Sequence, residues 1–378
     1  MRVTYVTSYD SMDVLNWSGS GYNIANALRA QNIELDFVGN LRYGLSPSLE
    51  LKKHIYKLIN KRFQPERSMY VASNYASQVQ ASLKSNSDIL FSPGTLPLAL
   101  LKTNKPKVFY TDATFAGMLN YYDDFKNLCT ETIVQGNLLE QEALSTSRLA
   151  IFASDWAAKS ATDHYLVDPG KIKVVPFGAN IEHNYSLSEI NLAITKRSKA
   201  ECHLLFIGVD WERKGGALAI NVAERLNQLG LKTTLHVAGI QNIPVRKLPT
   251  FVKNYGFISK ATCEGRTFLN QLLLKSHFLI VPSRAEAYGL VYCEANSFGV
   301  PAIATAVGGI PTVIKDEVNG KLFPLEASDN AYAEYILQVF TDNRRYQELA
   351  LSSFNEYTQR LNWSSAGQTI KNLLKEVL

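Results

Sequence analysis

The sequence has few residues of the types that build disulfide frameworks and metal sites. Its four cysteines are scattered, form no CxxC pair and follow no regular spacing. Its six histidines are equally dispersed, without an HExxH or paired spacing. These absences argue against a disulfide-stapled fold and a Cys- or His-based zinc site. We therefore expect no metal.

Long apolar runs and a strong charge of one sign are also missing. The longest apolar stretch, Ile89 to Leu101, is interrupted by Ser92-Pro93-Gly94 and by Pro97, so it is too short to span a bilayer. Lysine and arginine exceed aspartate and glutamate by 39 − 34 = 5, which gives no reason to expect nucleic acid as a partner. The first ten residues resemble a strand and a polar loop more than a signal peptide. We expect a cytoplasmic protein.

The chain does have the composition and the alternation of an α/β protein. With 378 residues, 46% hydrophobic and 19% charged, it is long enough for two domains with buried cores. Short β-branched runs alternate with helical segments before Asn180, and the alternation restarts at Leu204. Such alternation predicts parallel sheets. We predict two Rossmann-like, doubly wound domains, joined by a polar connection over 181–199.

Two glutamates in the stretch from Pro282 to Pro311 form the strongest candidate site. Glu286 lies in a loop after a predicted strand, and Glu294 lies in a helix expected to begin near Tyr288. A second strand follows and ends in Gly308-Gly309. Ligands of open α/β sheets collect at the carboxyl ends of the strands, where glycine-rich turns let backbone N–H groups approach an anion. The alternative is that both glutamates are solvated charges at a helix end.

The segment Glu286-AYGLVYC-Glu294, followed by GVPAIATAVGGIPTVI, resembles the E-x7-E region of the retaining GT-B glycosyltransferases of the group-1, or GT4, type. The resemblance covers most of the chain and is strongest in its C-terminal half. It implies two domains facing across a cleft: an acceptor-side domain (1–185), a nucleotide-sugar domain (186–360) and a C-terminal helix (361–378) that returns to the first. It also implies a nucleoside-diphosphate sugar as donor and a glycan, lipid or small molecule as acceptor.

The same resemblance assigns roles to individual residues. Glu294 should bind the ribose hydroxyls, and Glu286 should bind the hydroxyls of the transferred sugar. The base should contact backbone groups around Phe257. The diphosphate should lie along the backbone of four consecutive residues, Tyr288, Gly289, Leu290 and Val291.

A basic turn precedes the predicted helix at Gly215. Arg213 and Lys214 stand where a departing diphosphate could be neutralised. The family usually has an arginine directly after the first glycine of this turn, where this sequence has Val209. Either Arg213 replaces it, or Lys214 and backbone groups hold the phosphate alone. A solvated basic turn is the alternative.

Two further candidates lie in the first half of the chain. Gly19 and Gly21 sit in a loop that the family places against the donor phosphates, although a plain turn would explain them equally well on spacing alone. Asp112 follows a strand, near the position where many family members have a sugar-contacting histidine. We expect Asp112 to substitute for that histidine, with a helix N-cap as the alternative.

The segment 49–62 is amphipathic. Leu51, Ile55 and Leu58 share one face, and lysines occupy much of the rest. Such a helix could lie on an anionic membrane at its cytoplasmic side. The commoner arrangement, an apolar stripe packed on the sheet, is the one we expect.

Three functions compete at this stage. A retaining sugar transferase accounts for both glutamates, the basic turn and the glycines together. A nucleotide-sugar epimerase shares the architecture but normally has further acidic and histidine groups in the cleft. A catalytically silent binding protein of the same fold is the third candidate.

Overall fold

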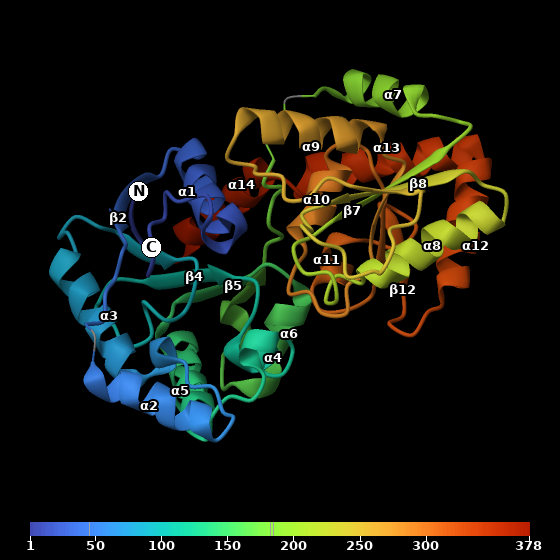
Figure 1. Ribbon diagram of the computed structural model, residues 1–378. Helices are drawn as coiled ribbons and strands as arrows, with labels where there is room; N and C mark the ends of the chain where they lie inside the picture. The colour runs from blue at the N-terminus through green and yellow to red at the C-terminus, as the bar shows by residue number, and fades with distance from the viewer. Residues whose placement is uncertain (45, 182, 184) are drawn as a thin grey trace. The chain divides into compact units, whose positions relative to one another are not determined.

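The chain divides into two compact units, which are described separately. The computed structural model describes residues 1–44, 46–181, 183 and 185–378. The first unit comprises Met1–Pro176 and Trp363–Leu378, and the second comprises Phe177–Asn362 (Figure 1). The first boundary therefore falls earlier than residue 185, where the sequence analysis placed it.

The first unit is built on a six-stranded parallel sheet with the order β2-β1-β3-β4-β5-β6. Its strands are β1 (Arg2–Val6), β2 (Glu34–Val38), β3 (Ile89–Ser92), β4 (Lys107–Thr111), β5 (Leu149–Phe152) and β6 (Ile172–Val174). Its helices are α1 (Ser20–Ala30), α2 (Pro47–Leu58), α3 (Met69–Ser82), α4 (Phe115–Met118), α5 (Thr130–Thr146), α6 (Asp155–His164) and α14 (Trp363–Glu376). The chain leaves β1 for β2 on one side and later returns to β3 on the other, so the winding reverses between β1 and β3.

The second unit repeats this arrangement with the strand order β12-β11-β10-β7-β8-β9. Its strands are β7 (Cys202–Ile207), β8 (Thr233–Ala238), β9 (Val252–Asn254), β10 (Phe278–Val281), β11 (Ala302–Thr305) and β12 (Gly320–Phe323). Its helices are α7 (Leu187–Lys196), α8 (Gly216–Gln228), α9 (Cys263–Lys275), α10 (Leu290–Asn296), α11 (Ile310–Val313), α12 (Asp329–Thr341) and α13 (Asn343–Arg360). Here the winding reverses between β7 and β10. The predicted α/β class with two doubly wound units is confirmed.

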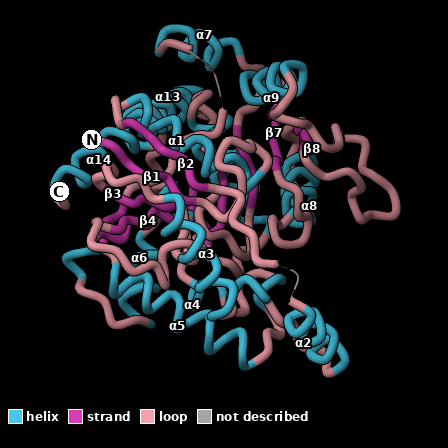
Figure 2. Tube along the Cα trace, turned by 90° about the vertical axis from the view of Figure 1, so that its left-hand side faces the viewer, coloured by secondary structure: helices cyan, strands magenta, loops and turns pink. Residues whose placement is uncertain are grey.

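The central strands of both sheets are covered on both faces. Every residue of β3, β4, β5, β10 and β11 is buried. Parallel strands covered by helices read as continuous apolar runs rather than as alternating ones, which is why the sequence reveals them. Figure 2 shows the helices and loops of the chain around the magenta strands.

The polar stretch 181–199 is not a plain connection as predicted, because it contains α7. Ser186 caps this helix through a capping box with Glu189, a pattern that the sequence carries as S-x-x-E. Ile190 and Ile194 are buried on its inner side. Glu182 and Asn184, at the start of the stretch, lie outside the described residues.

The last helix, α14, belongs to the first unit although it comes from the end of the chain. It lies against α1 (Figure 1). Gly367 makes the close approach possible, since a Cβ atom there would come within 2.7 Å of the carbonyl oxygen of Ala27.

The helix α2 packs in the opposite way from the one expected. Lys52 pairs with Glu131 at 2.5 Å, and the Tyr56 hydroxyl donates to the same carboxylate at 3.2 Å. These contacts turn the polar side inward, so Leu51 and Leu58 are 62% and 87% exposed. The expected packing of the apolar stripe on the sheet is wrong. Among the described residues, no helix has the length and hydropathy to cross a bilayer.

Three histidines form a cluster in the second unit, and two of them, His236 and His277, are buried. His236 Nε2 lies 3.2 Å from His203 Nδ1, and the ring of His203 stacks on that of His277 at 5.7 Å between centroids. His277 accepts the backbone N–H of His203 at 2.9 Å and lies 2.8 Å from the Ser198 carbonyl oxygen through Nε2. Burial lowers the pKa of both His236 and His277 to about 3.

This cluster predicts acid sensitivity. The folded unit keeps His277 neutral, whereas the unfolded chain binds its proton below about pH 6.5, so stability decreases as the pH falls from 6.5 toward 3. The slope should be up to about 1.4 kcal/mol per pH unit for each such histidine. Denaturant unfolding between pH 7 and pH 4 should give a smaller slope for His277→Gln than for the wild type. The exposed His54→Gln variant should keep the wild-type slope, and equal slopes in all three proteins would contradict the assignment.

Candidate functional site

The candidate site of the second unit lies where the winding of its sheet reverses. The loop after β7 carries Arg213 and Lys214, and the loop after β10 carries Glu286. Ligands of doubly wound sheets bind at this reversal point, beyond the carboxyl ends of the strands.

Two glycines allow the loops at this edge to pack closely. Gly215 has φ +74°, and a Cβ atom there would lie 2.1 Å from the Pro282 carbonyl oxygen. Gly239 after β8 has φ +98°, and its Cβ would lie 2.2 Å from the Gly208 carbonyl oxygen. Side chains at these positions would therefore separate the basic turn from its neighbours.

Glu286 is a buried carboxylate held by two cations. Its residue is 8% exposed, its Oε2 contacts Lys214 Nζ directly, and Arg213 Nη1 lies 3.3 Å away. Arg213 is itself oriented by Asp210, with Nε 3.2 Å from Oδ2, and donates to the Ala285 carbonyl oxygen at 3.1 Å. The structure thus brings these three predicted site residues together. Arg213 reaches the site although Val209 stands where the family has its arginine.

Glu294 forms a second buried pair within the same region. It lies in α10 with a side chain 2% exposed, and its Oε1 contacts Lys260 Nζ. Lys260 comes from the loop between β9 and α9, and its side chain is 41% exposed. The sequence analysis missed Lys260 because no motif marks it. The partner lies 34 positions away in the chain.

The helix after Glu286 starts two residues later than expected, since α10 begins at Leu290 and not at Tyr288. Gly289 stands before the helix with φ +94°, a conformation that delays the start. The Tyr288 side chain is buried and donates to the Phe177 carbonyl oxygen at 2.7 Å, so only its backbone is left for a ligand. Phe257 follows β9 and is 63% exposed.

The other predicted residues belong to the first unit. Gly19 precedes α1 with φ +81°, in line with a tight approach. Gly21 is not a loop glycine as expected but lies in the first turn of α1, where a Cβ atom would come within 2.4 Å of the Tyr9 hydroxyl. Asp112 follows β4 and lines a cavity of this unit.

The buried thiol of Cys293 is not reactive, and the described part of the chain contains no cluster of metal ligands. Burial raises the pKa of Cys293, next to Glu294, to about 12, so its thiol stays protonated. No group of three His, Cys, Asp or Glu side chains in the described ranges could hold a metal ion.

This architecture is that of the GT-B class, in which two Rossmann-like units form one chain. Sucrose-phosphate synthase from Thermosynechococcus elongatus shares the fold with a TM-score of 0.68 at 17% identity, over 100% of this chain and 99% of the other. Alr3699/HepE of Anabaena, solved in complex with UDP and glucose, has a TM-score of 0.65 at 15% identity, over 99% of both chains.

The sequence of the second unit is similar to a known family. Residues 189–355 match the family model described as glycosyl transferases group 1. The D-inositol 3-phosphate glycosyltransferase of Geodermatophilus obscurus is 30% identical over 215 residues, which are 53% of this chain and 47% of the relative. The match thus spans about half the length of that curated relative.

The Glu286 pairs predict a stability effect that is independent of any reaction. Glu286→Gln leaves Lys214, which is 8% exposed, without its counter-charge. Breaking a buried pair on one side costs about 3 kcal/mol or more, so the variant's second unit should unfold at clearly lower denaturant concentration. Inorganic pyrophosphate should then stabilise the variant more than the wild type, because Lys214 is no longer neutralised and Arg213 keeps only its pair with Asp210.

The control is Glu212→Gln on the same turn, whose side chain is exposed. It should change stability by no more than about 0.5 kcal/mol. A Glu286→Gln variant as stable as this control would show that the pair with Lys214 does not form in solution.

Proposed function

We propose that the protein is a retaining glycosyltransferase that moves a sugar from a nucleoside diphosphate to an acceptor hydroxyl. The observation that carries the proposal is the pair of buried carboxylates, Glu286 and Glu294, each held by a lysine within the group-1 region. The UDP and glucose named for one fold neighbour support a nucleotide-sugar donor. The base, the sugar and the linkage are left open.

The lysine and arginine beside Glu286 are suited to a diphosphate. Glu286 pairs with both Lys214 and Arg213, and Asp210 also pairs with Arg213. A bound diphosphate brings two or more negative charges and competes for both cations. Glu286 is then released toward the hydroxyls of the transferred sugar. The backbone from Tyr288 to Val291 is proposed to line the same diphosphate.

An equivalent exchange is proposed at Glu294. A carboxylate with a 2% exposed side chain needs a partner, and Lys260 provides it. Because Lys260 is the more exposed member of the pair, it can move away when ribose hydroxyls reach the carboxylate. The base would then lie against the backbone near Phe257.

The chemistry consists of charge stabilisation and orientation. The bond from the anomeric carbon to the β-phosphate oxygen breaks, and its electron pair leaves with the diphosphate. Lys214 and Arg213 stabilise that charge as it develops, so no metal is required in the proposal. The acceptor oxygen bonds to the same face of the sugar and its proton passes to the departing phosphate. Asp112, with Gly19 and Gly21, is proposed to act from the first unit.

The test compares variants of the two glutamates. Glu294→Ala should weaken binding of the nucleoside diphosphate, while Glu286→Ala should mainly lower kcat. Purified protein with a panel of nucleotide sugars should release nucleoside diphosphate slowly, and EDTA should leave the rate unchanged. Glu212→Gln serves as the control with wild-type rates.

Three outcomes would overturn the assignment. Effects of less than a few-fold for both glutamate variants would place the site elsewhere. Conversion of the donor sugar without release of nucleoside diphosphate would show an epimerase. A protein that binds no nucleotide and turns over no donor would be a silent member of the fold.

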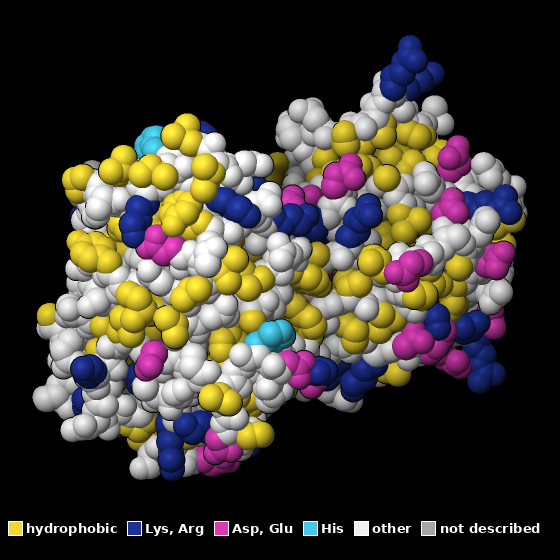
Figure 3. Space-filling model, turned by 90° about the horizontal axis from the view of Figure 1, so that it is seen from below, with side chains coloured by type: hydrophobic (Ala, Val, Ile, Leu, Met, Phe, Trp, Pro, Cys, Tyr) yellow, Lys and Arg dark blue, Asp and Glu magenta, His cyan; other side chains and the backbone are white. Residues whose placement is uncertain are grey.

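We also propose that the first unit rests on an anionic lipid surface through α2, at the cytoplasmic side of the membrane. Leu51, Ile55 and Leu58 are 62%, 49% and 87% exposed on this helix. Exposed Lys53 and Lys57 flank them. Figure 3, which shows the molecule from below, displays hydrophobic and basic side chains intermixed. An apolar stripe bordered by lysines matches the interface of an anionic bilayer.

Liposome sedimentation tests this contact. Vesicles containing anionic lipid should bind the wild type, and Leu58→Ser or Lys53→Glu/Lys57→Glu should reduce binding at least several-fold. Leu166→Ser removes an equally exposed leucine of the first unit and should have no effect. Equal binding to neutral and anionic vesicles, or no binding to either, would contradict the proposal.

A further inference from the structure

A groove in the second unit lies at the edge of the sheet opposite to the site of Glu286. The last turns of α7 and α9, which lie beside each other, form it together with the start of β7 (Figure 1). It therefore lies at the amino ends of β7 and β10, whereas Glu286 and the basic turn follow their carboxyl ends. Its volume is about 370 Å³. Pockets for small molecules are about 300–1,000 Å³, so the groove has room for a small ligand.

The ionisable side chains that line this groove are all basic. Lys196, Arg197, His203 and Lys275 line it, and among the described residues no aspartate or glutamate does. Within the same ranges, Lys196 and Lys275 make no hydrogen bond or ion pair, although the Lys275 ammonium lies 5.9 Å from the Tyr255 ring centroid. Each lysine ends a helix, where a cation is favourable, but this does not explain why both meet at one hollow. A hollow lined by one sign of charge attracts the opposite ion.

A buried guanidinium adds to the positive charge behind the groove. Arg197 is 6% exposed and donates hydrogen bonds of 2.7–3.1 Å to four groups: the carbonyl oxygens of Leu274, Phe298 and Gly299, and the Tyr346 hydroxyl. All four acceptors are neutral groups. Carbonyls at helix ends carry partial negative charge only, and in the described part of the chain no carboxylate pairs with this side chain. Arg197 is thus fixed in place without a full counter-charge.

A carboxylate close to His203 in the chain is already paired. Glu201 lies two positions before His203, and its two oxygens contact Lys232 at 3.1 Å and the Thr234 hydroxyl at 2.5 Å. These contacts hold it outside the lining of the groove. The excess of positive charge at the groove is therefore not offset by this neighbour.

A chain of hydrogen bonds gives His203 an unused donor. His236 Nδ1 lies 2.9 Å from the Tyr255 hydroxyl, and His236 Nε2 lies 3.2 Å from His203 Nδ1. Burial lowers the pKa of His236 to about 3, so this ring is neutral and carries one proton. The phenol is the stronger acid and imidazole the stronger base, so Tyr255 donates to Nδ1 and His236 donates through Nε2. The proton of a neutral His203 is then on its Nε2, which has no hydrogen-bond partner among the residues that the structure describes.

We propose that this groove is a second ligand site, which binds the phosphate group of a small phosphate monoester. A phosphate monoester carries nearly two negative charges near neutral pH and three acceptor oxygens. Two ammonium groups, of Lys196 and Lys275, supply the opposite charge, and His203 Nε2 donates a directed hydrogen bond. None of these groups belongs to the sites of Glu286 and Glu294, so the groove binds its ligand whether or not sugar transfer occurs.

Isothermal titration calorimetry of the full-length protein tests the site. Glycerol 3-phosphate is the monoester probe, glycerol is its uncharged counterpart, and inorganic phosphate is the ion without an organic part. The titrations are repeated with excess nucleoside diphosphate, because a phosphate can also bind Lys214 and Arg213. Glycerol 3-phosphate should still bind at one site per chain in that mixture, and glycerol should not bind. Added salt should weaken the binding, since the lysines are exposed to solvent.

Variants of the lining residues locate the bound phosphate. Lys196→Met and Lys275→Met should each weaken binding of glycerol 3-phosphate about 5-fold, the effect of one solvent-exposed charge pair. His203→Phe should also weaken it about 5-fold, whereas His203→Gln, whose amide can donate in place of Nε2, should stay within about 2-fold of the wild type. Lys199→Met is the matched control, because Lys199 is exposed near the end of α7 but does not line the groove. It should bind as the wild type does.

Four results would overturn the inference. Binding that nucleoside diphosphate abolishes and that Lys196→Met and Lys275→Met leave unchanged would place the phosphate beside Glu286, with the proposed transfer intact. Equal losses in Lys199→Met and Lys275→Met would show a general attraction and no site. Glycerol binding as tightly as its phosphate would exclude recognition of the phosphate group. Tighter binding of inorganic phosphate than of glycerol 3-phosphate would indicate a site for the free ion.

The proposed function can fail separately from the groove. A protein that binds glycerol 3-phosphate through Lys196 and Lys275 but binds no nucleoside diphosphate would contradict the proposed sugar transfer. The second ligand site would stand in that case.

Discussion

The neutralisation of Glu286 is the constraint on which the second unit's site depends. Burying a charged carboxylate with an 11% exposed side chain is unfavourable without partners, and Lys214 and Arg213 supply them from a different loop. The two loops can meet only because Gly215 lets the backbone approach Pro282. Asp210 then fixes the direction of Arg213. Two cations thus lie next to a carboxylate, and an anionic ligand can bind to them in its place.

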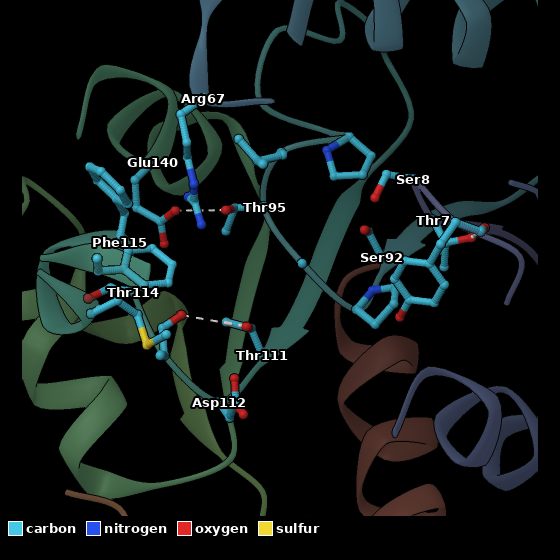
Figure 4. Close-up of a pocket in the computed structure, with 18 residues that line it drawn as sticks. Thr7, Ser8, Arg67, Ser92, Thr95, Thr111, Asp112, Thr114, Phe115 and Glu140 are labelled. Atoms are coloured by element: carbon cyan, nitrogen blue, oxygen red, sulfur yellow. Dashed lines mark hydrogen bonds between the residues drawn. The ribbon is translucent and has the colours of Figure 1, made fainter. Parts of the chain in front are cut away.

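Each unit uses the same topological position for different chemistry. In the second unit, the reversal between β7 and β10 gathers charged pairs, which suit a diphosphate. In the first, the reversal between β1 and β3 gathers hydroxyl-bearing side chains and Asp112 around a cavity (Figure 4). The fold supplies the location in both cases, and the side chains of the loops decide what is bound.

The sequence predicts those features that depend on neighbours along the chain. Buried parallel strands such as β10 read as apolar runs, so both sheets were predictable. Glu286, Lys214 and Arg213 were found through motifs at strand ends. Lys260 was missed, since its contact with Glu294 depends on tertiary packing. The predicted orientation of α2 was wrong for the same reason, because it depends on the contacts of this helix with the distant Glu131.

The cavity of the first unit shows how a signal can be misread. Ser92-Pro93-Gly94 appeared only as the interruption of an apolar stretch, although a polar turn after a buried strand marks a binding edge. The measurement that tests the central claim most directly is a crystal structure with the nucleoside diphosphate bound. The account predicts Lys214 Nζ within hydrogen-bond distance of a phosphate oxygen and separated from Glu286. An intact Lys214–Glu286 pair, with the diphosphate bound elsewhere, would contradict it.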